Sequence, residues 1–255
     1  MTTAGPRSGG IAYRLLKGSM GPVLRRLYPI RIEGLHNVPT DGPVILAINH
    51  RSFMDSMFIP AILSRPVTFV AKAEYFESWK TKWFFTAMGQ IPVRRGGGEA
   101  SQAALESAAD VLRAGQLFGI YPEGTRSPDG RLYKGRTGVA RLALDPGAVV
   151  IAVGIQGTDK VQPIGKKMLR VRVPVTVRFS RPLDFQRMRE HAITDPLVLR
   201  RITDEIMFEI RELCDQIYVN QYAPKKNAAL EEAVNAGGIA RIPTVSIAPD
   251  MVVAS

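Results

Sequence analysis

A histidine and an aspartate lie five positions apart in the segment 49–55, between the apolar runs 44–48 and 57–59. This segment falls where a predicted strand gives way to a predicted helix. A neutral imidazole accepts a proton near physiological pH, and a carboxylate on its other ring nitrogen fixes the tautomer. His50 and Asp55 are therefore a candidate general base and the acid that orients it. The alternative is that Asp55 caps the following helix and His50 is an ordinary turn residue.

A second polar segment, residues 123–127, combines groups that can bind an anion. Its glycine lets a ligand approach the backbone closely, and its arginine has a planar fork that matches two phosphate oxygens. Its threonine and serine add hydroxyl groups, and its glutamate is expected to bind a substrate hydroxyl or to hold the arginine. The alternative is a polar turn that leads into the turn signal at 128–130. The candidate residues are Glu123, Gly124, Thr125, Arg126 and Ser127.

Short apolar runs predict the strands that would position these groups, at residues 44–48, 67–71, 91–93, 117–121 and 149–155. Helices are predicted at 56–63, 73–88, 99–114, 138–144 and 196–219. A further strand at 171–179 is expected nearer a sheet edge, because Pro174 lacks a backbone donor. Strands separated by helices indicate a single layered α/β domain with a largely parallel central sheet flanked by helices.

The candidate groups follow these strands directly, at the end where open α/β sheets usually bind ligands. His50 follows the run at 44–48, and Lys72 follows the run at 67–71. Arg94 and Arg95 follow the run at 91–93, and Glu123 comes soon after the strand predicted at 117–121. We therefore expect a base, an acid and several cations to gather along one edge of the sheet.

The composition indicates an anionic partner, because the 255-residue chain carries a formal net charge of +11. A membrane surface, a phosphorylated substrate and a nucleic acid would all fit that charge. No nucleic-acid-binding module is recognisable and the charge is dispersed, so nucleic acid is not expected. A non-catalytic basic protein that binds membranes or nucleic acid is the alternative from a different class. The single cysteine, Cys214, lies in a helical apolar pattern and is expected to be a buried thiol rather than a nucleophile.

The ends of the chain differ from its middle, and we expect segments at 1–29, 30–222 and 223–255. The first is an amphipathic membrane-surface segment, in which Gly21 and Pro22 are predicted to break the helix in two. The second is the catalytic domain, and the third is a loose tail. No apolar run is long enough to span a bilayer, so we expect peripheral or monotopic binding at the cytoplasmic face of the membrane. The alternative for residues 11–28 is an ordinary surface helix with a basic face.

Together the motifs resemble those of the glycerolipid acyltransferase family, whose best-known members are lysophosphatidate acyltransferases. The resemblance rests on Asn49-His50-x4-Asp55 and on the run from Pro122 to Ser127. The segments 72–74, 89–95, 134–135 and 150–157 also resemble family blocks, so the likeness covers roughly residues 30–180. There are departures, which include Arg94 where an aspartate is frequent and Ala152 where a proline is usual.

The resemblance implies transfer of a fatty acyl chain from acyl-CoA, or from acyl carrier protein, to the sn-2 hydroxyl of 1-acylglycerol 3-phosphate. His50 would deprotonate that hydroxyl and Asp55 would orient His50, with direct attack on the thioester and no acyl-enzyme. The expected partners are a lysophospholipid, the acyl thioester and an anionic membrane surface. No metal and no cofactor are expected, and another lysophospholipid or glycolipid acceptor remains open.

The resemblance also distributes roles among the remaining candidates. Arg95 and Arg126 are implied to bind the acceptor phosphate, with Lys72 as a further candidate. Glu123 and its neighbours Gly124, Thr125 and Ser127 are implied to organise the acceptor. The helical spacing of Trp79, Trp83 and Phe84 is open to two interpretations. These side chains either line an acyl groove or contact lipid, or they pack in the core.

Overall fold

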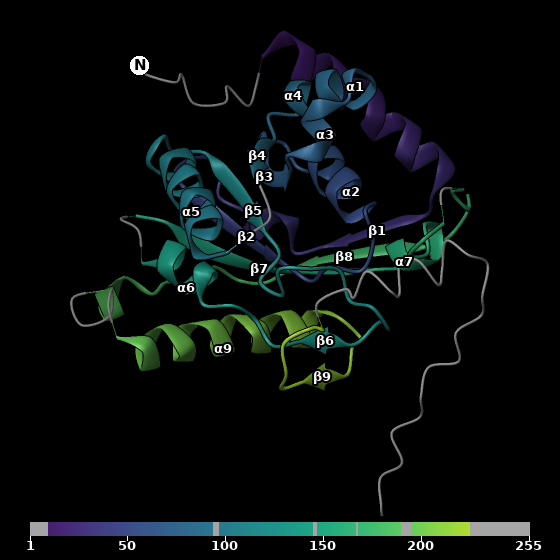
Figure 1. Ribbon diagram of the computed structural model, residues 1–255. Helices are drawn as coiled ribbons and strands as arrows, with labels where there is room; N and C mark the ends of the chain where they lie inside the picture. Colours follow the sequence, from purple (N-terminus) through teal and green to yellow (C-terminus); the bar gives the residue numbers. More distant parts are fainter. Residues whose placement is uncertain (1–9, 94–96, 145–146, 167, 190–194, 225–255) are drawn as a thin grey trace, which may run out of the picture. The chain divides into compact units, whose positions relative to one another are not determined.

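The computed structural model describes residues 10–93, 97–144, 147–166, 168–189 and 195–224. The chain divides into a compact unit, residues 1–223, and a second segment, residues 224–255. The first unit contains all of the helices and strands that the structure describes (Figure 1). Beyond residue 224 the expected loose tail lies outside the described residues.

A seven-stranded sheet, ordered β1-β8-β7-β2-β5-β3-β4, forms the centre of this unit (Figure 1). The strands are β1 (Ile30–Glu33), β2 (Val44–Ile48), β3 (Val67–Lys72), β4 (Ile91–Val93), β5 (Leu117–Ile120), β7 (Val149–Gln156) and β8 (Val175–Phe179). The five strands β7, β2, β5, β3 and β4 are parallel to their neighbours within that group. Strand β8 is antiparallel to β7 and parallel to β1. The prediction of a largely parallel sheet is therefore confirmed.

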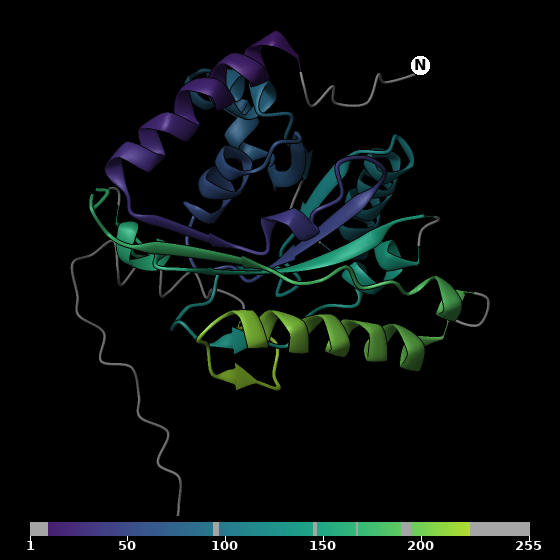
Figure 2. The ribbon, with the colours of Figure 1, turned by 180° about the vertical axis from the view of Figure 1, so that it is seen from behind.

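Helices cover both faces of the sheet (Figures 1 and 2). They are α1 (Ile11–Leu27), α2 (Asp55–Ile62), α3 (Glu74–Glu77), α4 (Trp79–Ala87), α5 (Gly97–Arg113), α6 (Gly138–Ala143), α7 (Thr158–Val161) and α9 (Pro196–Leu213). In strand β2, Ile45 and Ala47 pack in the same cluster as α5, α6 and α9. The alternate residues Val44, Leu46 and Ile48 pack with α1, α2 and α7. Because successive side chains point to opposite faces, this strand is a continuous apolar run with both faces buried.

Helix α1 runs unbroken through Gly21 and Pro22, so the predicted break is wrong. A proline inside a helix removes one backbone hydrogen bond and crowds the preceding turn. Tertiary packing outweighs that cost here, because Tyr13 and Leu24 are buried against the rest of the unit. A Cβ at Gly21 would lie 3.2 Å from the carbonyl oxygen of Ala61, so the glycine lets α1 approach α2 closely.

Helix α9 ends at Leu213, six residues before the predicted end. The chain then turns, so that Gln216 is buried while Ile217, which lies within the helix predicted at 196–219, is 76% exposed. A short strand β9 (Tyr218–Val219) follows and pairs in parallel with β6 (Leu132–Tyr133). This turn brings the segment after α9 next to the chain that follows β5.

Three smaller differences concern elements with weak local signals. The helix predicted at 73–88 is divided at Ser78 into α3 and α4. Strand β1 was not predicted, because it is short and carries charged residues at alternate positions. Strand β8 begins at Val175 and is one strand in from the sheet edge formed by β1.

Candidate active site

The two predicted motifs meet at the carboxyl ends of the neighbouring strands β2 and β5. His50 lies two residues after β2, and Glu123 lies three residues after β5. The backbone N–H of Ser127 donates to the carbonyl oxygen of His50 at 2.8 Å. The segments 49–55 and 123–127, separated by about seventy residues, therefore form one hydrogen-bonded unit, as expected from a parallel sheet.

His50 and Asp55 are joined by a 2.8 Å hydrogen bond between Nδ1 and Oδ2. The Asp55 side chain is fully buried, whereas the His50 side chain is 16% exposed. The same Oδ2 accepts the backbone N–H groups of Arg51 and Ser52, at 2.8 and 2.9 Å. Both amides precede α2, and the N-cap residue Met54 makes no side-chain capping bond. The structure therefore does not bear out the helix-cap alternative, because Asp55 orders the turn that carries His50.

This geometry leaves the imidazole ready to take a proton. When the Asp55 carboxylate accepts from Nδ1, that nitrogen carries the ring proton and Nε2 keeps its lone pair. A carboxylate in this position also stabilises the imidazolium that forms once Nε2 has been protonated.

Tyr121, which sequence reasoning did not select, stacks on the imidazole of His50. The two ring centroids are 3.8 Å apart with an interplanar angle of 14°, and the ring of Phe69 also stacks with Tyr121, at 5.6 Å between centroids. The Tyr121 hydroxyl is 2.7 Å from Ser56 Oγ on α2. A Cβ at Gly119 would lie 2.2 Å from the Phe69 ring, so this column of rings requires a glycine in β5. Burial raises the pKa of Tyr121 well above its ordinary value, so the phenol stays neutral beside the base.

Glu123 holds the backbone of the same loop. Its Oε1 accepts the backbone N–H of His50 at 3.1 Å, and its Oε2 accepts that of Tyr133 at 2.9 Å. The side chain is 1% exposed, and this burial is the main reason that its pKa rises to about 7. Among the described residues there is no hydrogen bond or ion pair between Glu123 and Arg126. The two Glu123 carboxyl oxygens therefore accept from backbone amides, and not from Arg126 as one of the two expectations had it.

Gly124 and Ser127 shape the turn between them. Gly124 has a φ of +74°, and a Cβ there would lie 2.9 Å from Arg136 Nε, so the backbone conformation and the space both favour glycine. Ser127 is buried, and its Oγ accepts the backbone N–H of Gly130 at 3.0 Å. Thr125 is half-buried in the same turn. The polar-turn interpretation and the anion-site interpretation of this segment are therefore compatible.

Cationic side chains lie beside this turn. Arg126 is half-buried, and its guanidinium makes no hydrogen bond or ion pair with any residue that the structure describes. Arg136 and Lys134 lie over the ring of Tyr222, at 5.2 and 5.8 Å from its centroid. These side chains can meet an anionic ligand without first breaking an ion pair to a described carboxylate.

Two other predicted cations have a more limited description. Lys72 is the last residue of β3, next to β5 in the sheet, and the structure describes its backbone alone. Arg95, which was expected to bind the acceptor phosphate together with Arg126, lies outside the described residues.

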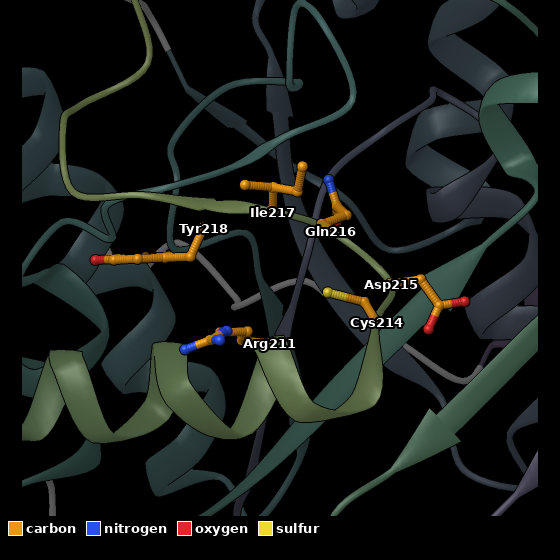
Figure 3. Close-up of a pocket in the computed structure, with 6 residues that line it drawn as sticks. All are labelled: Arg211, Cys214, Asp215, Gln216, Ile217 and Tyr218. Carbon is orange, nitrogen blue, oxygen red and sulfur yellow. The ribbon is translucent and has the colours of Figure 1, made fainter. Parts of the chain in front are cut away.

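Cys214 is buried, as predicted, and is not placed to act as a nucleophile. Burial raises the pKa of its thiol to about 11, which keeps it protonated and unreactive. It lines a surface pocket of about 470 Å³ after α9, shown in Figure 3, together with Arg211, Asp215, Gln216, Ile217 and Tyr218. None of these six residues belongs to the two motifs.

Comparison with known proteins identifies the family of the chain. Residues 29–156, which include both motifs, match the model of the Acyltransferase family. The chain belongs to this family. It is 31% identical over 157 residues to a chloroplastic 1-acyl-sn-glycerol-3-phosphate acyltransferase of Arabidopsis thaliana, over 61% of this chain and 44% of that protein.

Bacterial relatives show the same similarity. Over 130 residues the chain is 29% identical to a 1-acyl-sn-glycerol-3-phosphate acyltransferase of Borreliella burgdorferi, covering 51% of this chain and 52% of that one. The chain thus spans about half the length of these curated relatives. Its fold resembles the crystal structure of the 1-acyl-sn-glycerophosphate acyltransferase PlsC of Thermotoga maritima, with a TM-score of 0.60 and 25% identity. That likeness covers 81% of this chain and 84% of the other.

Proposed function

We propose that this acyltransferase-family chain moves a fatty acyl group from acyl-CoA, or from acyl carrier protein, to the sn-2 hydroxyl of 1-acylglycerol 3-phosphate. The product would be phosphatidic acid. The observation that carries the proposal is the 2.8 Å hydrogen bond from His50 to the buried Asp55, within the segment that matches the family. The acceptor is inferred from the names of the relatives, which are 1-acyl-sn-glycerol-3-phosphate acyltransferases.

In the proposed reaction, Nε2 of His50 removes the proton from the acceptor hydroxyl as its oxygen attacks the thioester carbonyl. The carbon–sulfur bond then breaks, and the departing thiolate takes the proton back from the imidazolium. Asp55 holds Nδ1 throughout, so the ring keeps the tautomer and orientation that the transfer needs. No acyl-enzyme forms, in keeping with a buried Cys214 thiol whose pKa is about 11.

The acceptor phosphate is proposed to bind Arg126, whose guanidinium is half-buried beside the turn at 123–127. A phosphate accepts two parallel N–H bonds from one guanidinium, which orients the acceptor as well as holding it. Arg95 and Lys72 remain proposed partners of the same phosphate. Glu123, Gly124, Thr125 and Ser127 are proposed to organise the acceptor by shaping this turn, because Glu123 and Ser127 bond backbone groups.

A membrane surface is the proposed location, with peripheral or monotopic binding at the cytoplasmic face. Helices α1 and α4 pack against each other (Figure 2) and expose large apolar side chains. Ile11 and Leu15 are 78% and 70% exposed, and Trp79 and Trp83 are 79% and 60% exposed. The basic residues of α1 suit anionic lipid headgroups. Within the described residues, no helix is both long and apolar enough to cross a bilayer.

Paired substitutions test the membrane proposal without removing α1, whose Tyr13 and Leu24 belong to the core. Leu15→Ser combined with Trp83→Ser should reduce partitioning onto vesicles that contain anionic lipid. Leu197→Ser is the control, because Leu197 is at least as exposed, at 79%, but lies on α9. Unchanged partitioning of the double variant, or an equal loss in the control, would contradict the proposed surface.

The proposed reaction is tested by thiol release with a panel of acceptors. Purified protein is incubated with acyl-CoA or acyl-loaded carrier protein and with 1-acylglycerol 3-phosphate, its phosphate-free analogue, or another lysophospholipid. We expect thiol release and phosphatidic acid with the first acceptor, and much slower release when the phosphate is absent. Activity confined to an acceptor without phosphate would contradict the role of Arg126, and no thiol release with any acceptor would contradict the reaction.

A further inference from the structure

Asn49, the residue before the proposed base, is completely buried, and its side-chain amide is fully engaged. Its Oδ1 accepts the backbone N–H of Ile155 at 2.7 Å, and its Nδ2 donates to the carbonyl oxygen of the same residue at 2.9 Å. These bonds fix the end of β2 against β7. Nδ2 also donates to Oε1 of Gln216 at 2.6 Å, and that partner lies 167 positions away in the chain, just after α9.

Gln216 connects the two motif segments through its side chain. Besides accepting from Asn49, it donates from Nε2 to the carbonyl oxygen of Gly130 at 2.7 Å. Gly130 closes the turn that begins at Ser127, since its N–H donates to the serine hydroxyl. One amide therefore ties the loop of His50 to the turn that follows Arg126. This amide lies well beyond residues 29–156, the part that matches the family.

We propose that Gln216 is a positioning residue. It holds the loop at 49–55, which carries His50, at a fixed distance from the turn at 127–130, which follows Arg126. The proposal rests on the proposed function, because this distance matters for a proton transfer between His50 and a bound acceptor. A reacting group misplaced by about 1 Å can cost on the order of 100-fold in rate. Neither Asn49 nor Gln216 needs to touch substrate for this effect.

An amide suits this position because one end must accept and the other must donate. Asn49 offers Nδ2 as a donor, while Gly130 offers a carbonyl acceptor. An ionised carboxylate could accept from Asn49 but could not donate to Gly130, and an apolar side chain could make neither hydrogen bond. The local packing favours a fixed geometry, since Gln216 is 6% exposed and Cys214, two residues earlier, is 5% exposed. In Figure 3 the Gln216 amide points away from α9 and from Arg211.

The segment after α9 also lies within electrostatic reach of the site. Glu123, Asp215 and Arg51 all influence the pKa of the Cys214 thiol, although burial is the main cause of its rise. Arg51 in turn pairs with Asp159 of α7 at 2.8 Å. A carboxyl placed at position 216 would meet the carbonyl oxygen of Gly130, to which it can donate only when it is protonated.

The test uses Gln216→Leu and Gln216→Glu in the full chain with the thiol-release assay. Gln216→Leu should lower kcat by about 10- to 100-fold and leave the KM for acyl-CoA within about twofold of wild type. Gln216→Glu should recover activity at low pH, where the carboxyl is protonated and can donate to Gly130. The ratio of variant to wild-type kcat should fall as pH rises, and taking this ratio removes the titration of His50 itself.

Two control variants separate positioning from general stability. Gln221→Ala removes an exposed glutamine of the same segment and should leave kcat unchanged. Ile210→Val removes a methylene from the buried face of α9 and should lower the unfolding midpoint without a comparable loss of kcat. A normal kcat in Gln216→Leu would overturn the proposal. So would a pH-independent ratio for Gln216→Glu, or a loss of kcat in Ile210→Val that matches its loss of stability.

A readout that does not depend on turnover keeps this inference separate from the proposed reaction. The imidazole resonances of His50 can be assigned by NMR, since the chain has three histidines and His50→Ala removes one set. Gln216→Leu should shift or broaden the His50 resonances and leave those of His36 unchanged. If wild type shows no acyl transfer but this change occurs, the reaction fails and the positioning role stands. Unaltered His50 resonances would overturn the positioning role whatever the activity.

Discussion

The loop at 49–55, which carries His50, and the turn at 123–127, which carries Arg126, are hydrogen-bonded to each other. They differ in whether their polar side chains have hydrogen-bond partners within the protein. In the loop, Asn49, Asp55 and the backbone of His50 all have hydrogen-bond partners within the protein. Arg51 pairs with Asp159, and the Ser52 hydroxyl donates to a carbonyl oxygen. Beside the turn, by contrast, Arg126 has no partner among the described residues.

The hydrogen bonds that hold the loop are formed before a ligand binds, whereas the guanidinium of Arg126 is expected to gain its partner from the ligand. A proton transfer needs donor and acceptor within a narrow range of distance, so a loop held by buried bonds serves it well. A phosphate brings its own charge and acceptor oxygens, so its site is served by cations that no carboxylate already neutralises. Changes in the loop are thus expected to lower kcat, and changes at the turn to raise the KM of the acceptor.

Among the variants that compare the loop with the turn, Asp55→Asn is expected to change the rate most. The amide cannot stabilise an imidazolium, and it can favour the wrong tautomer of His50. We expect kcat to fall by about 10²- to 10⁴-fold with little change in the KM of the acceptor. Steady-state thiol release measures both constants. A near-normal kcat would mean that Asp55 serves only to order the turn at 51–52.

Glu123→Gln is expected to change how stability depends on pH. The pKa of Glu123 is raised from 4.5 to about 7, so its protonated form stabilises the folded state below pH 4.5. That contribution is lost as pH rises through 7, and it amounts to on the order of 3 kcal/mol. Wild type should therefore lose stability relative to the variant between pH 4.5 and 7. Urea unfolding across this range measures the difference, and parallel profiles would show that the buried carboxyl does not titrate as described.

Arg126→Ala should raise the KM for 1-acylglycerol 3-phosphate by about 10- to 100-fold, the size expected for a hydrogen-bonded charge pair. The effect on kcat should be smaller. Arg113→Ala, which removes an exposed arginine from α5, is the control for loss of one positive charge. Equal changes in the two variants would indicate a general electrostatic effect and would remove the proposed difference between loop and turn.

The smallest effect is expected at Tyr121. Tyr121→Phe keeps the stacked ring but loses the bond to Ser56, so kcat should fall by only a few fold, the cost of about one hydrogen bond. Tyr121→Leu removes the ring, so its kcat should fall further, by roughly 10-fold. Steady-state rates of the pair rank the two contributions. If Tyr121→Phe were the slower variant, the hydroxyl rather than the stack would orient the imidazole.

Much of the fold was predictable because its central strands have strong local signals. Strands β2 and β7 are continuous apolar runs, which is how a strand buried on both faces reads in a sequence. Their order along the chain, with helices between them, indicates a parallel sheet, and a parallel sheet brings His50 and Glu123 to one edge. The short gap between His50 and Asp55 also allowed their contact to be expected.

The missed features depend on contacts between residues far apart in the chain. Gln216 is 167 positions from Asn49, and nothing in its local sequence marks it as a partner. Tyr121 was only the last residue of a predicted strand, with no sign of its contact with His50. The partners of Glu123 are backbone amides, which sequence patterns do not distinguish. Helix α1 continues through Pro22 because packing against α2 outweighs a local signal.

The role of His50 as the base is tested most directly by kcat for thiol release in His50→Ala with 1-acylglycerol 3-phosphate. The thermal unfolding midpoint is measured in parallel to show that the variant is folded. We predict a fall of about 10²- to 10⁴-fold in kcat, because the variant has no group to take the hydroxyl proton. Undiminished turnover in the folded variant would contradict the assignment of His50 as the base.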